Sequence, residues 1–161
     1  MAVHKLVIDD FEEADFQLIA IHTTLEDYRL AYFINQNLPI LLSRSKKEIQ
    51  TSFQTIKTGF TRFVFEDPDN QIAWNLIENK KEIAVSQKNK GQTLFENSEE
   101  FTTTLYLVPE YKKVDFFFKI DAEKSQVNIA GLMGKIKNIP SLTTLYQVDK
   151  SKIKSKNNLI F

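Results

Sequence analysis

The stretch LVPEYKKVDFFFKID, residues 107–121, contains two apolar runs separated by a proline and a set of charged side chains. In the second run, one set of alternating side chains is Val114, Phe116, Phe118 and Ile120, and the other is Asp115, Phe117 and Lys119. This period of two predicts a strand that turns the first set toward the core. Pro109 has no N–H and fits where strand pairing stops, so residues 110–113 are predicted to form the turn of a hairpin.

Upstream of this stretch, the pattern predicts a strand, a helix and a second strand. Residues 15–23 and 39–45 are rich in apolar and β-branched side chains, which favours strands. Thr23 and Glu26 have the Thr-x-x-Glu spacing of a capping box, so a helix is expected to begin there. Pro39 ends the helical pattern.

Downstream, the same order is repeated. Asp121 is a candidate N-cap for a helix, and residues 141–148 are expected to form the last strand. The apolar stripe of this helix is Ile129, Leu132, Met133 and Ile136. Both units carry Asn-Leu-Pro or Asn-Ile-Pro before the second strand, at residues 37–39 and 138–140. This likeness is compatible with duplication or with a common way of ending a helix.

The middle of the chain predicts an antiparallel meander. Its strands are expected at residues 59–67, 70–79, 80–87 and 100–108, with a mobile loop at 86–100. The predicted fold class is therefore α+β: a mostly antiparallel, twisted sheet with two helices on one face, in which two β-α-β units flank a β-meander. Residues 1–149 are expected to form a single domain, followed by a lysine-rich tail or edge strand at residues 150–161.

Composition excludes several classes of site. The 161 residues include no cysteine, so disulfides, thiolate metal sites and cysteine nucleophiles are excluded, and a cytoplasmic location is expected. No signal peptide and no apolar run of about 20 residues is present, so no membrane association is expected. The formal net charge is zero, whereas a dedicated nucleic-acid-binding domain usually carries a basic excess.

Residues 108–116, VPEYKKVDF, resemble the signature of the IPExxxVDY family of small bacterial proteins. The segments EDYRLAYFIN and NIPSLTTLYQVD are also similar to it. The resemblance implies a single-domain protein and supplies no activity. Val108 stands where the signature has isoleucine, and Phe116 stands where it has tyrosine. A chemistry shared by the family would therefore not depend on that hydroxyl, and periodicity places Phe116 on the core face.

The turn has three interpretations. In the structural one, Asp115 accepts hydrogen bonds from backbone N–H groups and fixes the hairpin. In the second, the turn is a binding loop with Tyr111 as an exposed aromatic anchor. The candidate binding residues are Pro109, Glu110, Tyr111, Lys112, Lys113 and Asp115. In the third, Glu110 and Asp115 form a catalytic carboxylate pair, which is disfavoured because no nucleophile, histidine or oxyanion hole is apparent nearby.

The basic end of the chain is the second candidate binding region. Its lysines are Lys150, Lys152, Lys154 and Lys156. They are compatible with a solvated tail, with a guarded edge strand, or with docking onto an acidic partner such as a protein or RNA, with salt-dependent affinity.

Other chemistry has weaker support. His4 and His22 would need carboxylates to bind zinc, and a structural or surface role is the simpler interpretation. The acidic run at residues 9–15 lacks the spacing of a calcium loop, and GLMGK at 131–135 lacks the spacing of a phosphate-binding loop. We therefore expect no metal and no cofactor.

The function expected from these features is a non-enzymatic intracellular protein-binding or adaptor module that uses the 109–113 turn and the basic tail. The expected partner is a protein; a nucleic acid at the tail is less favoured, and a homodimer would hide apolar side chains on a second sheet face. One alternative is a small-ligand-sensing regulatory domain, which would have an enclosed apolar pocket. A third is an unrecognised hydrolase.

Overall fold

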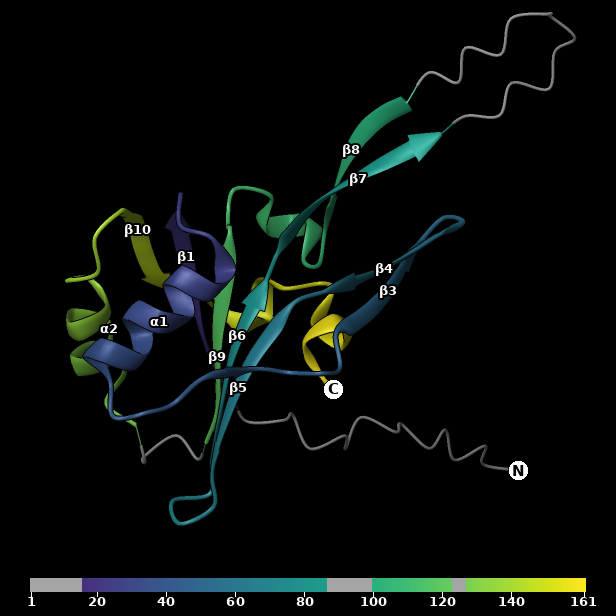
Figure 1. Cartoon of the computed structure of the whole chain (residues 1–161). Coiled ribbons are helices and arrows are strands. Elements are labelled where there is room, and N and C mark those ends of the chain that lie inside the picture. The colour runs from purple at the N-terminus through teal and green to yellow at the C-terminus, as the bar shows by residue number, and fades with distance from the viewer. Residues whose placement is uncertain (1–15, 87–99, 123–126) are drawn as a thin grey trace, which may run out of the picture.

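The computed structural model describes residues 16–86, 100–122 and 127–161. It has an α+β fold with two helices and a six-stranded antiparallel sheet in the order β10-β1-β9-β6-β5-β2, as the alternation of apolar residues predicts (Figure 1). The six strands are β1 (Phe16–Thr23), β2 (Ser43–Arg44), β5 (Arg62–Asp67), β6 (Ile72–Glu78), β9 (Phe116–Asp121) and β10 (Leu142–Gln147). β9, the strand of the quoted stretch, lies between β1 and β6.

The two helices cover one face of this sheet. They are α1 (Asp27–Asn37) and α2 (Ile129–Ile136), and both contribute to the same apolar cluster. From α2, Leu132 and Ile136 enter this cluster, as the helical spacing predicts. β9 contributes Phe116, Phe118 and Ile120 to it.

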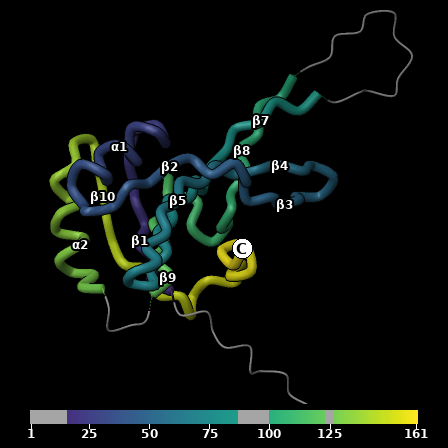
Figure 2. The backbone as a smooth tube through the Cα atoms, turned by 60° about the horizontal axis from the view of Figure 1, so that its bottom comes forward, coloured from purple at the N-terminus to yellow at the C-terminus, as the bar shows by residue number. Residues whose placement is uncertain are grey.

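The second face carries a separate apolar cluster. Phe117 of β9 is fully buried there, together with Leu18 and Ile77 of the neighbouring strands. The cover includes irregular chain around residues 107–114 and the C-terminal segment, which lies away from the helices (Figure 2), together with residues of the two hairpins, Ile49, Phe60 and Leu105. The prediction that Val114 shares a face with Phe118 was wrong, because Val114 precedes the strand and packs in this second cluster.

Two hairpins extend from the sheet. One is β3 (Ile49–Phe53) with β4 (Ile56–Phe60), and the other is β7 (Lys80–Ser86) with β8 (Glu100–Tyr106). Both project from the body in Figures 1 and 2. The predicted meander is therefore correct for the antiparallel pairs β5–β6 and β7–β8, and wrong in joining them, since β7 and β8 leave the sheet and β9 takes the place beside β6. β3 was not predicted, and the expected mobile loop lies mostly outside the described residues, at 87–99.

The helix starts differ from prediction. α1 has Glu26 as N-cap without a side-chain capping bond, so the capping box was wrong. Thr23 Oγ1 instead accepts a hydrogen bond from Leu25 N at 3.1 Å and donates one to Ser141 O at 2.8 Å. Asp121 ends β9, and Asn128 is the N-cap of α2, accepting from Gly131 N at 3.1 Å.

The C-terminal segment is ordered against the body. It forms two short 3-10 helices, Lys150–Lys152 and Lys156–Leu159, with Ile153 and Leu159 buried in the second cluster. Among the described residues it makes no strand, so it does not form the edge strand considered above. Within the described ranges, no helix combines the length and apolarity that crossing a membrane requires.

Candidate functional site: the joined turn and C-terminal segment

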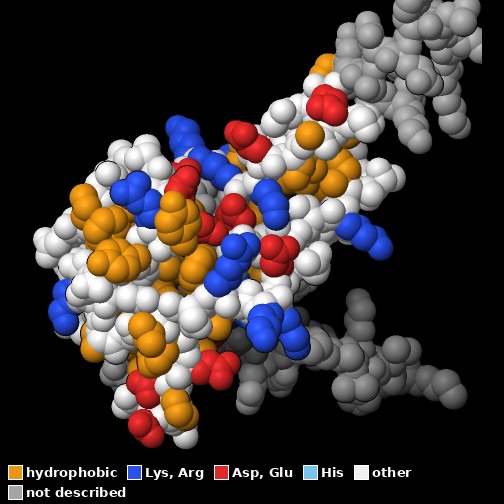
Figure 3. All heavy atoms as spheres, in the orientation of Figure 1, with side chains coloured by type: hydrophobic (Ala, Val, Ile, Leu, Met, Phe, Trp, Pro, Cys, Tyr) orange, Lys and Arg blue, Asp and Glu red, His pale blue; other side chains and the backbone are white. Residues whose placement is uncertain are grey.

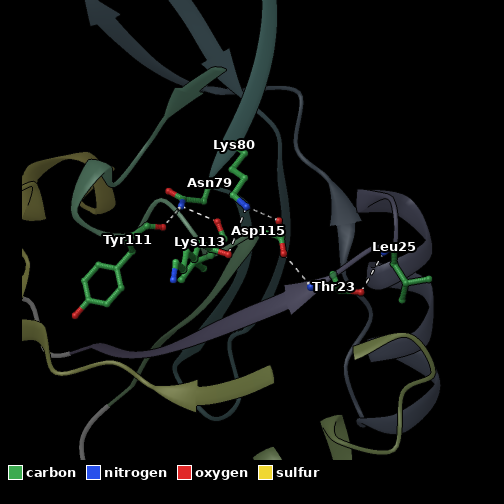
Figure 4. Close-up of polar contacts among 8 residues, drawn as sticks. Thr23, Leu25, Asn79, Lys80, Tyr111, Lys113 and Asp115 are labelled. Carbon is green, nitrogen blue, oxygen red and sulfur yellow. Dashed lines mark hydrogen bonds and ion pairs between the residues drawn. The ribbon is translucent and has the colours of Figure 1, made fainter. Parts of the chain in front are cut away.

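Asn79, between β6 and β7, is the polar centre of the predicted turn (Figure 4). Its side chain is fully buried, and its Nδ2 donates to Tyr111 O at 2.9 Å and to Val114 O at 2.8 Å. Its Oδ1 accepts from Val108 N at 2.9 Å. A buried amide that satisfies three backbone groups fixes an irregular loop that has no ladder of its own. The sequence analysis placed this position only at the boundary between the strands expected at 70–79 and 80–87.

Asp115 ties the same turn to the rest of the sheet. Its Oδ2 accepts a hydrogen bond from Thr23 N at 3.0 Å, and its Oδ1 lies 2.9 Å from Lys80 Nζ (Figure 4). Asp115 accepts a backbone N–H bond, as the structural interpretation expected, but the predicted hairpin was wrong, because β8 pairs with β7 and β9 pairs with β1 and β6. The donor, however, belongs to the end of β1 and not to the turn itself.

Glu110 joins the turn to the C-terminal segment. Its Oε1 accepts from Ser155 N at 2.8 Å and from Ser155 Oγ at 3.0 Å. Burial opposes the charged form, but hydrogen bonds from the Glu110 backbone, Ser155 and the Lys154 backbone outweigh it and lower the pKa of Glu110. Asn158 Nδ2 adds a bond to Leu107 O at 2.8 Å. Two regions that sequence analysis selected separately therefore form one surface.

Local helical structure and packing position the apolar and aromatic residues of the turn. Pro109 opens the 3-10 helix Pro109–Tyr111. The Tyr111 ring is half-buried and meets Phe117 edge-on at 6.1 Å, so the expectation of a freely exposed anchor was wrong. Phe116 is 8% exposed and lies in the helix-covered cluster, which confirms its place on the core face.

The predicted lysines differ in exposure. Lys112, Lys113, Lys152 and Lys154 are exposed, whereas Lys150 and Lys156 are half-buried. Lys150 Nζ lies 5.0 Å from the centre of the Phe16 ring. The lysines therefore do not act as one uniform solvated tail.

Two apolar side chains that the sequence analysis did not select complete this surface. Ile160 and Phe161 are 55% and 50% exposed. The Phe161 ring is held between two cations, with the Arg62 guanidinium 4.5 Å and Lys119 Nζ 4.6 Å from its centre. Lys119 is itself buried and paired with Asp121 at 2.8 Å. We define the turn–tail surface by its exposed members: Lys112, Lys113, Lys152, Lys154, Ile160 and Phe161.

Exposed apolar groups also occur elsewhere. Figure 3 shows hydrophobic side chains at the surface around α1 and along the β7–β8 hairpin. Tyr28 and Tyr32, one helical turn apart on α1, are 59% and 58% exposed. These two tyrosines are therefore surface groups of the helix layer.

The acidic side chains of the turn are occupied by contacts within the chain. Both carboxylates of the turn are engaged, Glu110 by Ser155 and Asp115 by Lys80 and Thr23. Within the described residues, no three histidine, cysteine, aspartate or glutamate side chains are placed to hold a metal ion. His22 lies beside Tyr146, with 5.7 Å between ring centres. His4 and the acidic run at 9–15 lie outside the described residues.

Two hollows occur on the described surface. One, of about 670 Å³, is lined by Arg44, Ser45, Lys46, Lys47, Glu48 and Gln50. The other, of about 570 Å³, lies between the β5–β6 turn and the start of α2 and includes Trp74 and Asn128. Both are open and their linings mix polar and apolar surface, whereas a small-ligand sensor is expected to have an enclosed apolar pocket.

Comparison with known proteins adds no relative. No family model, no curated protein and no solved structure matches this chain. The resemblance of residues 108–116 to the IPExxxVDY family therefore stays a prediction from the sequence.

Proposed function

We propose that this chain is a non-enzymatic, cytoplasmic protein-binding module. Its turn–tail surface docks a partner segment in which acidic residues flank an apolar side chain. The observation that carries the proposal is the Glu110–Ser155 contact, which fastens two basic regions 45 residues apart into one surface. A preformed surface loses less conformational entropy on binding than two separate flexible segments would.

The charge of this surface favours an acidic partner. Two ion pairs occur in the described part of the chain, Lys80–Asp115 and Lys119–Asp121, and neither involves the four exposed lysines. The nearest carboxylate of the turn, Glu110, accepts its bonds from Ser155. All four lysines are exposed and can be reached by a partner, and their contribution should weaken as salt increases.

The apolar members supply what charge alone cannot. Ile160 and the half-exposed Phe161 ring belong to the same C-terminal segment as Lys152 and Lys154, and aromatic side chains at the centre of a contact carry much of the binding energy in protein interfaces. Because Arg62 and Lys119 hold the Phe161 ring, little side-chain freedom remains to be lost on binding. The Tyr111 ring supports this surface by packing against Phe117.

The test uses defined peptides and two matched lysine pairs. Fluorescence anisotropy is measured with labelled peptides that combine aspartate or glutamate with leucine or phenylalanine, and with versions carrying asparagine and glutamine instead. We expect the acidic peptides to bind and the neutral ones not to bind. Lys152→Glu with Lys154→Glu should abolish binding. Lys135→Glu with Lys137→Glu, on exposed positions at the end of α2, should leave it unchanged.

A labelled single-stranded RNA serves as the competing probe in the same assay. Preference for RNA over every acidic peptide would replace the proposal with nucleic-acid binding. Equal loss of peptide binding in the two lysine pairs would show that the effect is net charge alone, and would overturn the assignment to the turn–tail surface.

A further inference from the structure

The two edges of the six-stranded sheet differ in how they are protected. β2 has only two residues, Ser43 and Arg44, and Lys46 and Lys47 follow it. β10 has six residues, Leu-Thr-Thr-Leu-Tyr-Gln, without charge, proline or glycine. Within the described residues, no strand pairs with the outer side of β10. Sheets normally protect such edges with lysine, proline or very short strands, so β10 is the unprotected edge.

The backbone groups that β10 offers can be identified from its pairing with β1. Val148 N donates to Leu18 O at 2.8 Å, and Tyr146 lies opposite Ala20. In an antiparallel pair, residues that bond to the neighbour alternate with residues whose N–H and C=O point the other way. Tyr146 and Val148 therefore bond toward β1. Leu145 and Gln147 point their backbone N–H and C=O groups away from the sheet.

We propose that β10 pairs antiparallel with β10 of a second copy of this chain, about a twofold axis at Tyr146. In this register, Leu145 of each copy exchanges both backbone hydrogen bonds with Gln147 of the other. Tyr146 faces its own counterpart in the intervening pair, where side chains lie closest. The result is one continuous sheet through both copies.

The register follows from two constraints. Successive side chains of a strand point to opposite faces, so a twofold pairing must place a residue opposite itself. A pairing centred on Leu145 would bring in Thr143, which is the extra residue where the register with β1 slips between His22 and Thr23. A pairing centred on Tyr146 uses only the regular segment 144–148. It also keeps α1 and α2 on the same side of the joined sheet in both copies.

The neutrality of β10 favours a second copy as its occupant. In a twofold contact, each charge near the axis meets a like charge, which is destabilising. β10 carries no charge, whereas β2 would bring Arg44 against Arg44. An aromatic side chain opposite itself is a favourable cross-strand pair. Pairing over so short a segment buries less than the roughly 1,000 Å² typical of stable interfaces, so the dimer is expected to be weak and concentration-dependent.

A cysteine cross-link tests the register directly, because the chain contains no native cysteine. In the proposed pairing, Tyr146→Cys places two sulfur-bearing residues opposite each other with Cα atoms about 4.5 Å apart, within disulfide range. Thr144→Cys, on the same face of the same strand, would be separated from its counterpart by roughly 14 Å. We expect mild oxidation to give a covalent dimer with Tyr146→Cys and none with Thr144→Cys. Equal yields from both, or none from either, would overturn the pairing.

Sedimentation without cross-linking provides the second measurement. Gln147→Pro removes an outward N–H and should leave the ladder with β1 intact, so it should give a folded monomer at every concentration. Gln147→Ala loses only the side-chain bond to Gln17 and should still dimerise. A wild-type chain that stays monomeric at the highest attainable concentration would refute the proposal. Because no turn–tail residue takes part, Lys152→Glu with Lys154→Glu should dimerise like wild type, whatever the outcome of the peptide assay.

Discussion

The two faces of the central strand are buried by different means. Phe118 of β9 packs beneath α1 and α2, while the adjacent Phe117 packs beneath the turn and the C-terminal segment, and both are fully buried. A helix satisfies most of its own backbone hydrogen bonds, so its cover needs only apolar side chains. Irregular chain does not, and on that face Asn79, Glu110 and Asn158 supply the missing bonds. On the face without helices, buried or half-buried polar side chains thus do for the irregular chain what a helix does for its own backbone.

The largest loss of stability should come from removing the ring of either Phe117 or Phe118. Phe117→Ala and Phe118→Ala should each lower the free energy of unfolding by about 3–5 kcal/mol, measured by urea denaturation, because each leaves a cavity. The two should differ in hydrogen exchange. Phe117→Ala should also expose the amides of Val108 and Ser155, whereas Phe118→Ala should not. Identical exchange patterns would mean that the two covers unfold as one unit.

Removing the buried amide tests the irregular face alone. Asn79→Ala breaks three side-chain hydrogen bonds and should cost about 3 kcal/mol in the same urea measurement. Asn35 is the matched control, since its amide bonds Leu42 N at 2.7 Å and Leu42 O at 3.0 Å beside α1 in a half-buried setting. Asn35→Ala should cost about 1 kcal/mol. A larger loss from Asn35→Ala would reverse the comparison.

The strands and helices near β9 could be predicted because their information is local. Alternation identified β9, and the 3.6-residue stripe identified α2. The identical Asn-Leu/Ile-Pro endings gave no indication of where each return strand would lie. β10 has six residues and lies beside β1, whereas β2 has two and lies at the opposite edge. Strand position depends on pairing partners distant in the chain, which a local pattern does not encode.

The candidate site was predictable only in part, again because local patterns show in the sequence and contacts between distant residues do not. The turn and the lysines were apparent from composition, but their contact was not, because Glu110 and Ser155 are 45 residues apart. Asn79 reaches its partners over 29 to 35 residues. The sequence pattern therefore gave no indication of the role of this side chain. Long-range side-chain bonds to irregular backbone leave no periodic trace in a sequence.

The helix layer should tolerate a change in its backbone. Gly134 lies inside α2 with open space where a Cβ would be, so Gly134→Ala should raise the free energy of unfolding by about 0.5–1 kcal/mol through helix propensity. Gly59 of β4 is the contrasting position, because an added Cβ there would meet the Glu48 side chain. Gly59→Ala should raise the melting temperature less than Gly134→Ala does, because the Glu48 and Gln50 side chains must move aside. A destabilised Gly134→Ala would show that α2 is more tightly constrained than its packing indicates.

The smallest expected effect is the pH dependence of the stability that Glu110 contributes where the turn meets the C-terminal segment. The pKa of Glu110 is lowered in the folded chain, so its carboxylate stabilises the fold above the ordinary glutamate pKa of 4.5 and loses that contribution as pH falls through the lower folded pKa. The group is largely solvent-exposed, and screening limits the effect to about 0.5 kcal/mol. The difference in unfolding free energy between wild type and Glu110→Gln should therefore be present at neutral pH and vanish in acid. Glu82→Gln, at an exposed position of β7, controls for loss of one negative charge. If the Glu110→Gln difference persisted at low pH, the Ser155 contact would not depend on charge, and hydrogen bonding by a neutral side chain would suffice to fasten the C-terminal segment to the turn.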